Sequence, residues 1–124
     1  MPTNTVPPAP HTQLALKLIY RANIFIVNRT RPTLQMGRDD SNDIVVASLF
    51  ASRLHARVQE RDGQFVLADL SSNGTFLLLD EESSERRLRG DEMLLTGRGW
   101  LGLGKSAARH GDHSVRFALQ AETA

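Results

Sequence analysis

The chain of 124 residues contains no cysteine, so it forms neither disulfide bonds nor thiolate metal sites. A chain of this length does not need such cross-links, because a domain of about 100–150 residues buries roughly two-thirds of its unfolded surface. The absence of cysteine fits a reducing compartment, and we therefore expect a cytoplasmic protein.

An excess of charge of one sign is also lacking. The 15 basic and 14 acidic residues give a formal charge of +1, which argues against a surface devoted to nucleic acid. No apolar run approaches the roughly 20 residues of a membrane-spanning helix. No signal peptide is visible either, because prolines stand where its apolar segment should lie. We expect a soluble domain that binds neither nucleic acid nor membrane.

Proline is concentrated at one end of the chain, where residues 1–13 contain four of the five prolines. This composition predicts a flexible Pro-rich tail or linker over residues 1–13. We expect a single domain over residues 14–120 and a short C-terminal tail over residues 121–124. Because the first segment resembles a linker, the sequence suggests one module of a longer protein.

Short runs of β-forming residues alternate with turn sequences through the domain. Apolar alternation over residues 14–19 predicts a half-buried strand, and the apolar run 24–27 suits a strand buried on both faces. Asp-Gly at residues 62–63 and Asn-Gly at 73–74 are strong turn signals. Further strands are expected at 33–36, 44–46, 56–60, 65–70, 75–79, 93–95, 100–103 and 114–119, whereas the charged residues 80–90 are expected to form a solvated loop. The pattern predicts an all-β sandwich or barrel.

Two formal matches to catalytic or nucleotide sites carry little weight. Residues 99–106 fit the phosphate-loop pattern G-x-x-x-x-G-K-S/T, but the sequence after Ser106 is too short and broken for the helix that this motif requires. Ser52 and His55 lack the oxyanion or nucleophile-elbow context of a catalytic pair. The four histidines show no metal-ligand spacing. We therefore expect no enzyme, no cofactor and no metal site.

Three polar, turn-forming clusters separate the apolar runs, at residues 36–44, 52–56 and 69–76. They carry an arginine, a Ser-Arg pair and a Ser-Asn pair. A guanidinium group can bind a phosphate through two parallel hydrogen bonds, and hydroxyls and loop amides can complete the shell. Each of these residues alone is an ordinary surface or turn residue. Together they predict loops that converge on an anionic ligand at one end of a β-scaffold.

The motifs in these clusters, in this order and spacing, resemble those of the forkhead-associated (FHA) domain. They are Gly37-Arg38, Ser52-Arg53-x-His55-Ala56 and Ser71-Ser72-Asn73-Gly74-Thr75. The resemblance implies an FHA-like β-sandwich of two twisted, mainly antiparallel sheets with about eleven short strands, whose apical loops bind phosphothreonine peptides. A narrower resemblance, over residues 97–117, is to FHA domains attached to bacterial nucleotide cyclases.

By position, the resemblance implies a role for each residue of the motifs. Arg38 would contact the phosphate, and Ser52 would donate its hydroxyl to it. Arg53 would add a phosphate or peptide contact. Ser72 would border the phosphothreonine pocket, and Asn73 would hold the peptide backbone beside it.

A second group of motif residues would shape the loops without touching the ligand, namely Gly37, His55, Gly74 and Thr75, with His55 acting through a structural hydrogen bond. The segment 46–51 is unusually apolar for a loop beside a peptide groove. Two interpretations of it remain open, because it could select an apolar residue beyond the phosphothreonine or pack inward.

The sequence therefore predicts a phosphothreonine-dependent adaptor. It would recruit a protein phosphorylated by a Ser/Thr kinase, or another part of its own parent protein. A second hypothesis is a phosphate-independent interaction or oligomerisation module on the same fold. A third is self-recognition, in which phosphorylated Thr5 of the tail docks in trans onto Arg38 and Ser52.

Overall fold

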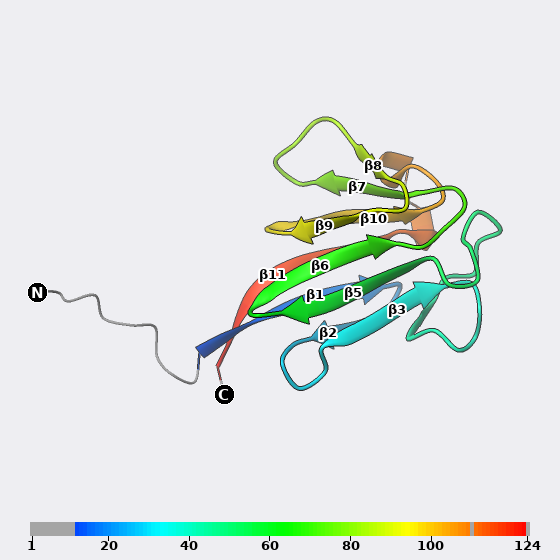
Figure 1. Ribbon diagram of the computed structural model, residues 1–124. Coiled ribbons are helices and arrows are strands. Elements are labelled where there is room, and N and C mark those ends of the chain that lie inside the picture. Colours follow the sequence, from blue (N-terminus) through cyan, green and yellow to red (C-terminus); the bar gives the residue numbers. More distant parts are fainter. Residues whose placement is uncertain (1–11, 110, 124) are drawn as a thin grey trace, which may run out of the picture.

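The computed structural model describes residues 12–109 and 111–123, so the predicted tail up to residue 11, with Thr5, lies outside the described residues. The described chain forms eleven strands and two short 3₁₀ helices, which confirms the predicted all-β sandwich (Figure 1). The elements are β1 (Thr12–Tyr20), β2 (Asn23–Val27), β3 (Thr33–Gly37), β4 (Ile44–Val45), β5 (Ala56–Arg61), β6 (Gln64–Asp69), β7 (Thr75–Leu79), β8 (Arg86–Leu88), β9 (Glu92–Leu95), β10 (Arg98–Leu103), η1 (Ala107–Arg109), η2 (Gly111–His113) and β11 (Val115–Thr123).

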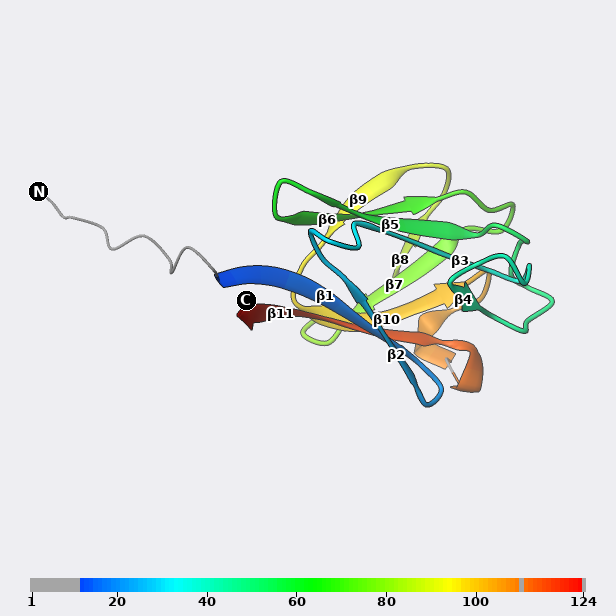
Figure 2. The ribbon, with the colours of Figure 1, turned by 90° about the horizontal axis from the view of Figure 1, so that it is seen from below.

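The strands form two sheets that face each other, as the view in Figure 2 shows. One sheet has six strands in the order β2-β1-β11-β10-β7-β8, and the other has five in the order β4-β3-β5-β6-β9. Neighbouring strands are antiparallel except β3 and β4, which pair in parallel. The longest pairing joins the first and last strands, from Thr12 opposite Thr123 to Ile19 opposite Arg116.

The core lies between the sheets and is built from alternate residues of each strand. In β1, Leu16 and Leu18 are fully buried, and in β11 Phe117 is fully buried opposite Leu18. Leu67 of β6, in the five-stranded sheet, and Leu101 of β10, in the six-stranded sheet, are also fully buried in this core. Burying each such side chain contributes about 1.5–3 kcal/mol, so the period-2 pattern fixes which face of each strand points inward.

Three sequence predictions need correction. The run 24–27 is not buried on both faces, because β2 is an edge strand and Ile24 is 60% exposed. Trp100, which the sequence pattern suggested as a core strand residue together with Leu101 and Leu103, is half-buried on the outer face of its sheet. The charged segment 80–90 is not loop throughout, because β8 lies within it and pairs with β7. In each case local composition does not reveal the strand's neighbours, which decide burial.

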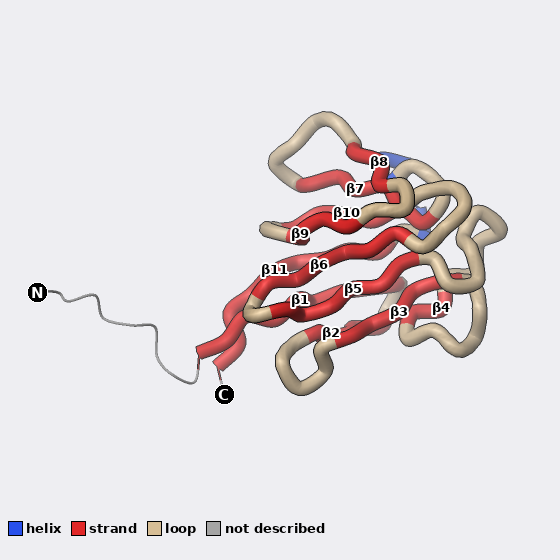
Figure 3. The backbone as a smooth tube through the Cα atoms, in the orientation of Figure 1, coloured by secondary structure: helices blue, strands red, loops and turns tan. Residues whose placement is uncertain are grey.

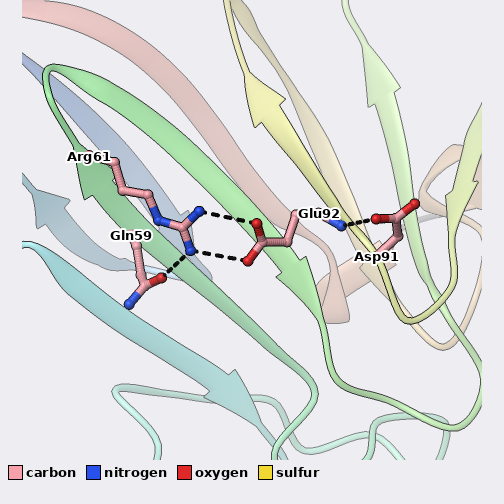
Figure 4. Close-up of polar contacts among 4 residues, drawn as sticks. All are labelled: Gln59, Arg61, Asp91 and Glu92. Carbon is pink, nitrogen blue, oxygen red and sulfur yellow. Dashed lines mark hydrogen bonds and ion pairs between the residues drawn. The ribbon is translucent and has the colours of Figure 1, made fainter.

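The outer face of the five-stranded sheet carries a group of polar side chains that join β5 to β9. Arg61 of β5 donates to both carboxylate oxygens of Glu92 on β9, at 3.1 and 3.0 Å, and to Oε1 of Gln59 at 2.7 Å (Figure 4). The hydrogen bond from Arg61 lowers the pKa of the Glu92 carboxyl. Because both side chains are nearly half exposed, this ion pair contributes little to stability.

Four loops gather at the end of the sandwich that lies opposite Thr12 and Thr123. Three of them are tan segments at the right of Figure 3, covering residues 38–43, 46–55 and 70–74, and the fourth begins at residues 104–106 and continues into the helices η1 and η2, drawn in blue. The three polar clusters of the sequence fall on the first three of these loops. Among the described residues, no helix is long and apolar enough to cross a membrane.

Candidate functional site

Gly37 brings the first two loops into contact. A Cβ at this position would collide with the carbonyl oxygen of Arg53, so only glycine allows the close approach. The backbone N–H of Arg38 then donates to the carbonyl of Ser52 at 2.9 Å, and that of Asp39 to the carbonyl of Arg53 at 3.1 Å. Asn42, which is 8% exposed, donates from Nδ2 to the same Arg53 carbonyl at 2.6 Å. These bonds set Arg38 beside Ser52 and Arg53.

The Arg38 side chain lies at the surface, with its base fixed. Its Nε donates to the carbonyl of Ala51 at 3.1 Å. Within the described part of the chain, its two terminal nitrogens form no hydrogen bond or ion pair. The guanidinium is therefore held from one side and offers its fork to a ligand from the other, which lowers the entropy cost of binding.

His55 joins the second loop to the third. The fully buried ring accepts a hydrogen bond at Nδ1 from the backbone N–H of Ser52, at 2.9 Å, and donates from Nε2 to the carbonyl of Gly74, at 2.9 Å. Burial lowers the pKa of the imidazole below its ordinary value, against the opposing effects of the Gly74 carbonyl and the Asp69 charge. The neutral ring thus orients the backbone of Ser52.

Asp69 organises the third loop. Its carboxylate accepts hydrogen bonds from the Ser71 hydroxyl at 2.6 Å, the Thr75 hydroxyl at 2.7 Å and the backbone N–H of Gly90 at 2.8 Å. Burial alone would raise its pKa, but these hydrogen bonds together outweigh that effect and lower it. Ser71 in turn accepts from the N–H of Gly74 at 2.8 Å, which completes the turn at Gly74, where φ is 94°.

The third loop places Ser72 and Asn73 against the second. The N–H of Ser72 donates to the Ser52 hydroxyl at 3.2 Å, and Nδ2 of Asn73 donates to the carbonyl of Phe50 at 3.2 Å. Arg87 of β8 supports this turn from outside, donating to the Asn73 carbonyl from Nε at 3.2 Å and from a terminal nitrogen at 2.6 Å. Sequence reasoning placed Arg87 in a solvated loop and missed this contact.

The structure thus brings the nine motif residues to which the resemblance assigns a role to one end of the molecule, in two sets. The first set is at the surface or half-buried and comprises Arg38, Ser52, Arg53, Ser72 and Asn73. The second set is buried beneath it and comprises Gly37, His55, Gly74 and Thr75. Sequence reasoning assigned no role to Asp69 or Asn42, although both lie in the polar turn clusters and the segment Ser41-Asn42-Asp43-Ile44 is also typical of the family that the motifs resemble.

One acidic side chain lies among the arginines. Asp39 accepts a short hydrogen bond from the Ser41 hydroxyl, and this bond, with the Ser41 N–H and the charges of Arg53 and Arg38, lowers the pKa of its carboxyl. The Asp39 carboxylate is therefore ionised at neutral pH beside Arg38 and Arg53, and two more acidic residues, Asp40 and Asp43, are exposed on the same loop. Attraction of an anionic ligand depends on the local guanidinium groups rather than on an excess of positive charge in this loop.

The apolar segment 46–51 divides between the two interpretations left open by the sequence. Val46 and Ala51 are buried in the core, whereas Leu49 is 91% exposed and Phe50 is 50% exposed. Leu49 and Phe50 line a groove of about 320 Å³, whose other wall includes Lys105. The Lys105 ammonium lies 5.2 Å from the centre of the Phe50 ring. The groove therefore combines the apolar side chains of Leu49 and Phe50 with a lysine and several polar groups.

The geometry does not favour catalysis by Ser52 and His55. Nδ1 of His55 accepts from the backbone N–H of Ser52, and Nε2 donates to Gly74, so neither nitrogen is directed at the Ser52 hydroxyl. At and just after the segment 99–106, which matches the phosphate-loop pattern, groups that would bind a phosphate already bind an acidic side chain of the protein. The Glu85 carboxylate accepts from the Ser106 hydroxyl at 2.7 Å and from the N–H of Ala108 at 2.8 Å. No cluster of potential metal ligands occurs among the described residues.

Comparisons with known proteins agree with this geometry. The family model described as the FHA domain matches residues 34–94, which include all three motifs. An oxoglutarate dehydrogenase inhibitor from Corynebacterium diphtheriae is 33% identical over 93 residues, covering 73% of this chain and 64% of the relative. The chain thus spans less than two-thirds of this relative's length.

Solved structures share the fold. The crystal structure of the FHA-1 domain of Mycobacterium tuberculosis Rv1747 superposes with a TM-score of 0.64 at 20% identity, covering 86% of this chain and 97% of that one. Mycobacterium tuberculosis EmbR, solved in complex with a low-affinity phosphopeptide, has a TM-score of 0.63 at 25% identity, covering 90% of this chain and 25% of EmbR.

These matches also bear on two sequence predictions. A family of binding domains and a relative named as an inhibitor support the prediction that the chain is not an enzyme. The relative is not a cyclase, so it gives no support to the narrower resemblance to cyclase-attached domains.

Proposed function

Because the chain carries an FHA domain, we propose that its loop end binds a phosphothreonine-containing segment of another protein, or of its own parent protein. The observation that carries this proposal is the guanidinium of Arg38, anchored through Nε on Ala51 and open at its fork, beside the Ser52 hydroxyl. A surface residue without a ligand has no need of that anchoring. The proposal makes the protein a non-catalytic adaptor, acting in the cytoplasm where Ser/Thr kinases have ATP.

In this proposal Arg38 takes two phosphate oxygens with its fork, and Ser52 donates its hydroxyl to a third. Arg53, exposed on the same loop, adds a longer-range attraction. A phosphothreonine carries about −1.5 to −2 charges at pH 7, and a hydrogen bond to a charged group contributes roughly 1.5–3 kcal/mol net. Two or three such bonds with backbone contacts give a micromolar complex, about −8 kcal/mol.

The third loop would hold the peptide on either side of the phosphate. Ser72 borders the space above Ser52, because its N–H already bonds the Ser52 hydroxyl. Asn73 uses Nδ2 to bind the Phe50 carbonyl, so its Oδ1 is the atom we assign to a peptide N–H. The Asn73 side chain would therefore hold the second loop and the ligand at the same time.

The groove of Leu49, Phe50 and Lys105 adds a preference for the residues that flank the phosphothreonine. It begins at Phe50, whose carbonyl is bound by Asn73, so a peptide leaving the phosphate site in this direction enters it directly. The side chains of Leu49 and Phe50 and the ammonium of Lys105 favour an apolar residue together with an acidic one. We propose this as the basis of partner selection.

A second candidate is a phosphate-independent protein interaction through the same end. Four of the seven large apolar side chains exposed in the described chain lie on the second and third loops. They are Leu49, Phe50, Leu54 and Leu70. Apolar side chains gathered around a site mark protein contact surfaces, and such contacts do not need a phosphate.

The experiment is a titration with an oriented phosphothreonine peptide library, with matched phosphoserine and unphosphorylated libraries and the variants Arg38→Ala and Arg29→Ala. We expect micromolar binding that requires both phosphothreonine and Arg38 and is unchanged in Arg29→Ala, an exposed arginine outside the loop end. Enrichment of apolar and acidic residues on one flank would support the role of the groove.

Equal binding of phosphorylated and unphosphorylated peptides would favour the second candidate. Absence of binding by a protein that unfolds cooperatively would reject both peptide-binding proposals. A further arm of the test uses a peptide copy of residues 1–11 phosphorylated at Thr5. Binding of that peptide at the library optimum would identify the parent protein as its own ligand.

A further inference from the structure

The four edge strands of the described sandwich differ in how they are protected. Unpaired N–H and C=O groups on an edge strand invite another strand, and proteins cover them with charge, proline, short length or neighbouring chain. β4 has only two residues, β8 contains Arg86 and Arg87, and β9 contains Glu92. β2 has the sequence Asn-Ile-Phe-Ile-Val and uses none of these devices.

The contrast is clearest with β3, which lies across the sandwich from β2. The open side of β3 is covered by Asp43, whose N–H donates to the Gln35 carbonyl at 3.0 Å and whose carboxylate accepts from the Gln35 N–H at 2.8 Å. β4 covers the next residues, pairing with Met36 and Gly37. β2 pairs with β1 along one side, and no described segment pairs with its other side.

Both faces of β2 offer apolar side chains to a neighbouring strand. Ile24 is 60% exposed on the outer face, together with the half-exposed Ile26. On the inner side, a groove of about 460 Å³ lies between β2 and β3, lined by Phe25 and Leu34 together with the charged Arg31 and Asp43. Because successive side chains of a strand point to opposite faces, an added strand would place alternate residues in this groove and beside Ile24.

Positive charge flanks β2 at both ends. Arg21 precedes the strand, and Arg29 and Arg31 follow it, all three exposed. The Asn28 side chain fixes the turn that carries Arg29 and Arg31, since its Oδ1 accepts from the N–H of Thr30 at 3.1 Å and of Arg31 at 2.9 Å. None of the three arginines forms an ion pair with the rest of the described chain.

This charge pattern argues against a second copy of the chain as the occupant. Two β2 strands paired antiparallel about Phe25 would set Arg21 of one copy opposite Arg29 of the other, and a shift of one register step would set it opposite Arg31. Like charges directly opposite each other destabilise a strand pair. A strand with acidic ends would instead meet opposite charge at both ends of β2.

We propose that the open edge of β2 binds an extended segment of a partner protein, apolar in its centre and acidic at its ends, which adds a seventh strand to the six-stranded sheet. Backbone hydrogen bonds supply affinity in this mode of binding, and side-chain positions on alternate faces supply selectivity. β2 is the terminal strand at one edge of that sheet. The surface is separate from Arg38 and requires no phosphate.

The test uses the full 124-residue chain and a synthetic probe. The probe has a centre of five residues, Val-Thr-Val-Ile-Val, matching the length of β2, between two Glu-Asp pairs. Titration followed by amide NMR should shift resonances of β2 and slow hydrogen exchange at alternate amides of that strand. Raising the salt concentration should weaken binding, because the ends of the probe interact through charge.

Two protein variants and two probe variants locate the contact. Ile24→Lys should reduce affinity at least tenfold, whereas Leu94→Lys, the matched change of an exposed residue on edge strand β9, should leave it unchanged. The double variant Arg29→Glu with Arg31→Glu, confined to an exposed loop, should also weaken binding if Ile24→Lys proves poorly folded. Probes with a central proline or with lysine ends should not bind.

The proposal fails if the probe shifts the β9 or β4 edge instead of β2, if Ile24→Lys and Leu94→Lys behave alike, or if no probe binds. If the β2 amides became more protected from hydrogen exchange as the protein concentration rose in the absence of probe, the occupant of the edge would be a second copy of the chain, and the proposal would be overturned. Arg38→Ala should bind the probe as the unmodified chain does. Loss of phosphopeptide binding therefore leaves this proposal intact, and the reverse also holds.

Discussion

Two polar networks share the loop end of the molecule and differ in what satisfies them. Beneath the surface, Asp69, His55 and Thr75 are held by hydrogen bonds of 2.6–2.9 Å to other groups of the chain. Above them, Arg38 and Arg53 are exposed, and the fork of Arg38 has no partner among the described residues. The buried network fixes the shape of the loops, and the exposed one is available to a ligand.

The difference follows from solvation. A buried donor or acceptor without a partner costs about 1–3 kcal/mol, so the lower network must be complete in the free protein. An exposed arginine keeps its hydration until a ligand replaces it, so the upper network can remain open without cost. Substitutions in the lower network should therefore affect unfolding, and those in the upper network should affect binding. The following predictions test that division.

The largest effect is expected for Asp69→Ala. The change leaves the Ser71 and Thr75 hydroxyls and the Gly90 N–H without their shared acceptor. We expect a loss of about 3–4 kcal/mol in the free energy of unfolding, measured by urea denaturation. Asp40→Ala, at an exposed position of the first loop, should change it by less than about 0.5 kcal/mol. Equal stability of the two variants would show that the Asp69 network is not a structural element.

Arg38→Ala should give the next largest effect, and on a different quantity. We expect a loss of about 2–3 kcal/mol in the free energy of phosphopeptide binding, with unfolding changed by less than about 0.5 kcal/mol. Arg38→Lys should bind the phosphopeptide more tightly than Arg38→Ala and more weakly than the unmodified protein, because an ammonium keeps the charge but lacks the planar fork. Calorimetric titration measures both variants. A large loss of stability in Arg38→Ala would move this residue into the structural network.

The turns and strands that depend on local sequence could be predicted. The Asp62-Gly63 hairpin and the Asn73-Gly74 turn occur as expected, because positive φ angles need glycine or a few polar residues; φ is 53° at Asp62 and 94° at Gly74. Alternation in residues 14–19 identified Leu16 and Leu18 as core residues, although Leu14 of the same pattern is 44% exposed. The order and spacing of three motifs indicated which loops would meet, through resemblance rather than through physics.

Features that depend on long-range neighbours could not be predicted. Ile24 is exposed because β2 has a partner on one side, a fact of sheet order rather than of composition. Arg87 reaches Asn73 because β8 pairs with β7, and the charged segment around it gave no sign of that pairing. The direction of Leu49 and Phe50, outward while Val46 and Ala51 turn inward, likewise depends on the fold of the whole second loop.

Ser52→Ala tests a residue that belongs to both networks. Its hydroxyl accepts from the N–H of Ser72 at 3.2 Å and, in our proposal, donates to the phosphate. We expect a loss of about 1–2 kcal/mol in phosphopeptide binding and of about 0.5 kcal/mol in stability, since the Ser72 N–H is exposed and can bond water instead. Ser52→Thr, which keeps the hydroxyl, should restore most of the binding. Failure of this rescue would remove the hydroxyl from the phosphate site.

The smallest effect concerns pH and the one titratable ring that links the networks. Burial lowers the pKa of His55 in the folded protein, whereas the unfolded chain titrates near pH 6.5. Below that pH the unfolded state binds more protons than the folded one, so the stability that neutral His55 provides is complete above about pH 6.5 and is lost as the pH falls toward the folded pKa. Protonation at Nδ1 would also remove the acceptor for the hydrogen bond from the Ser52 N–H.

Urea denaturation between about pH 7.5 and pH 5.5 should show falling stability, and His55→Asn, although less stable throughout, should show a flatter dependence of stability on pH. The Asp69 carboxyl, whose pKa is lowered, stays ionised over this range and adds no slope of its own. An equal slope in both proteins would assign the pH dependence to other groups and would leave His55 as a packing residue without an electrostatic part in holding Ser52.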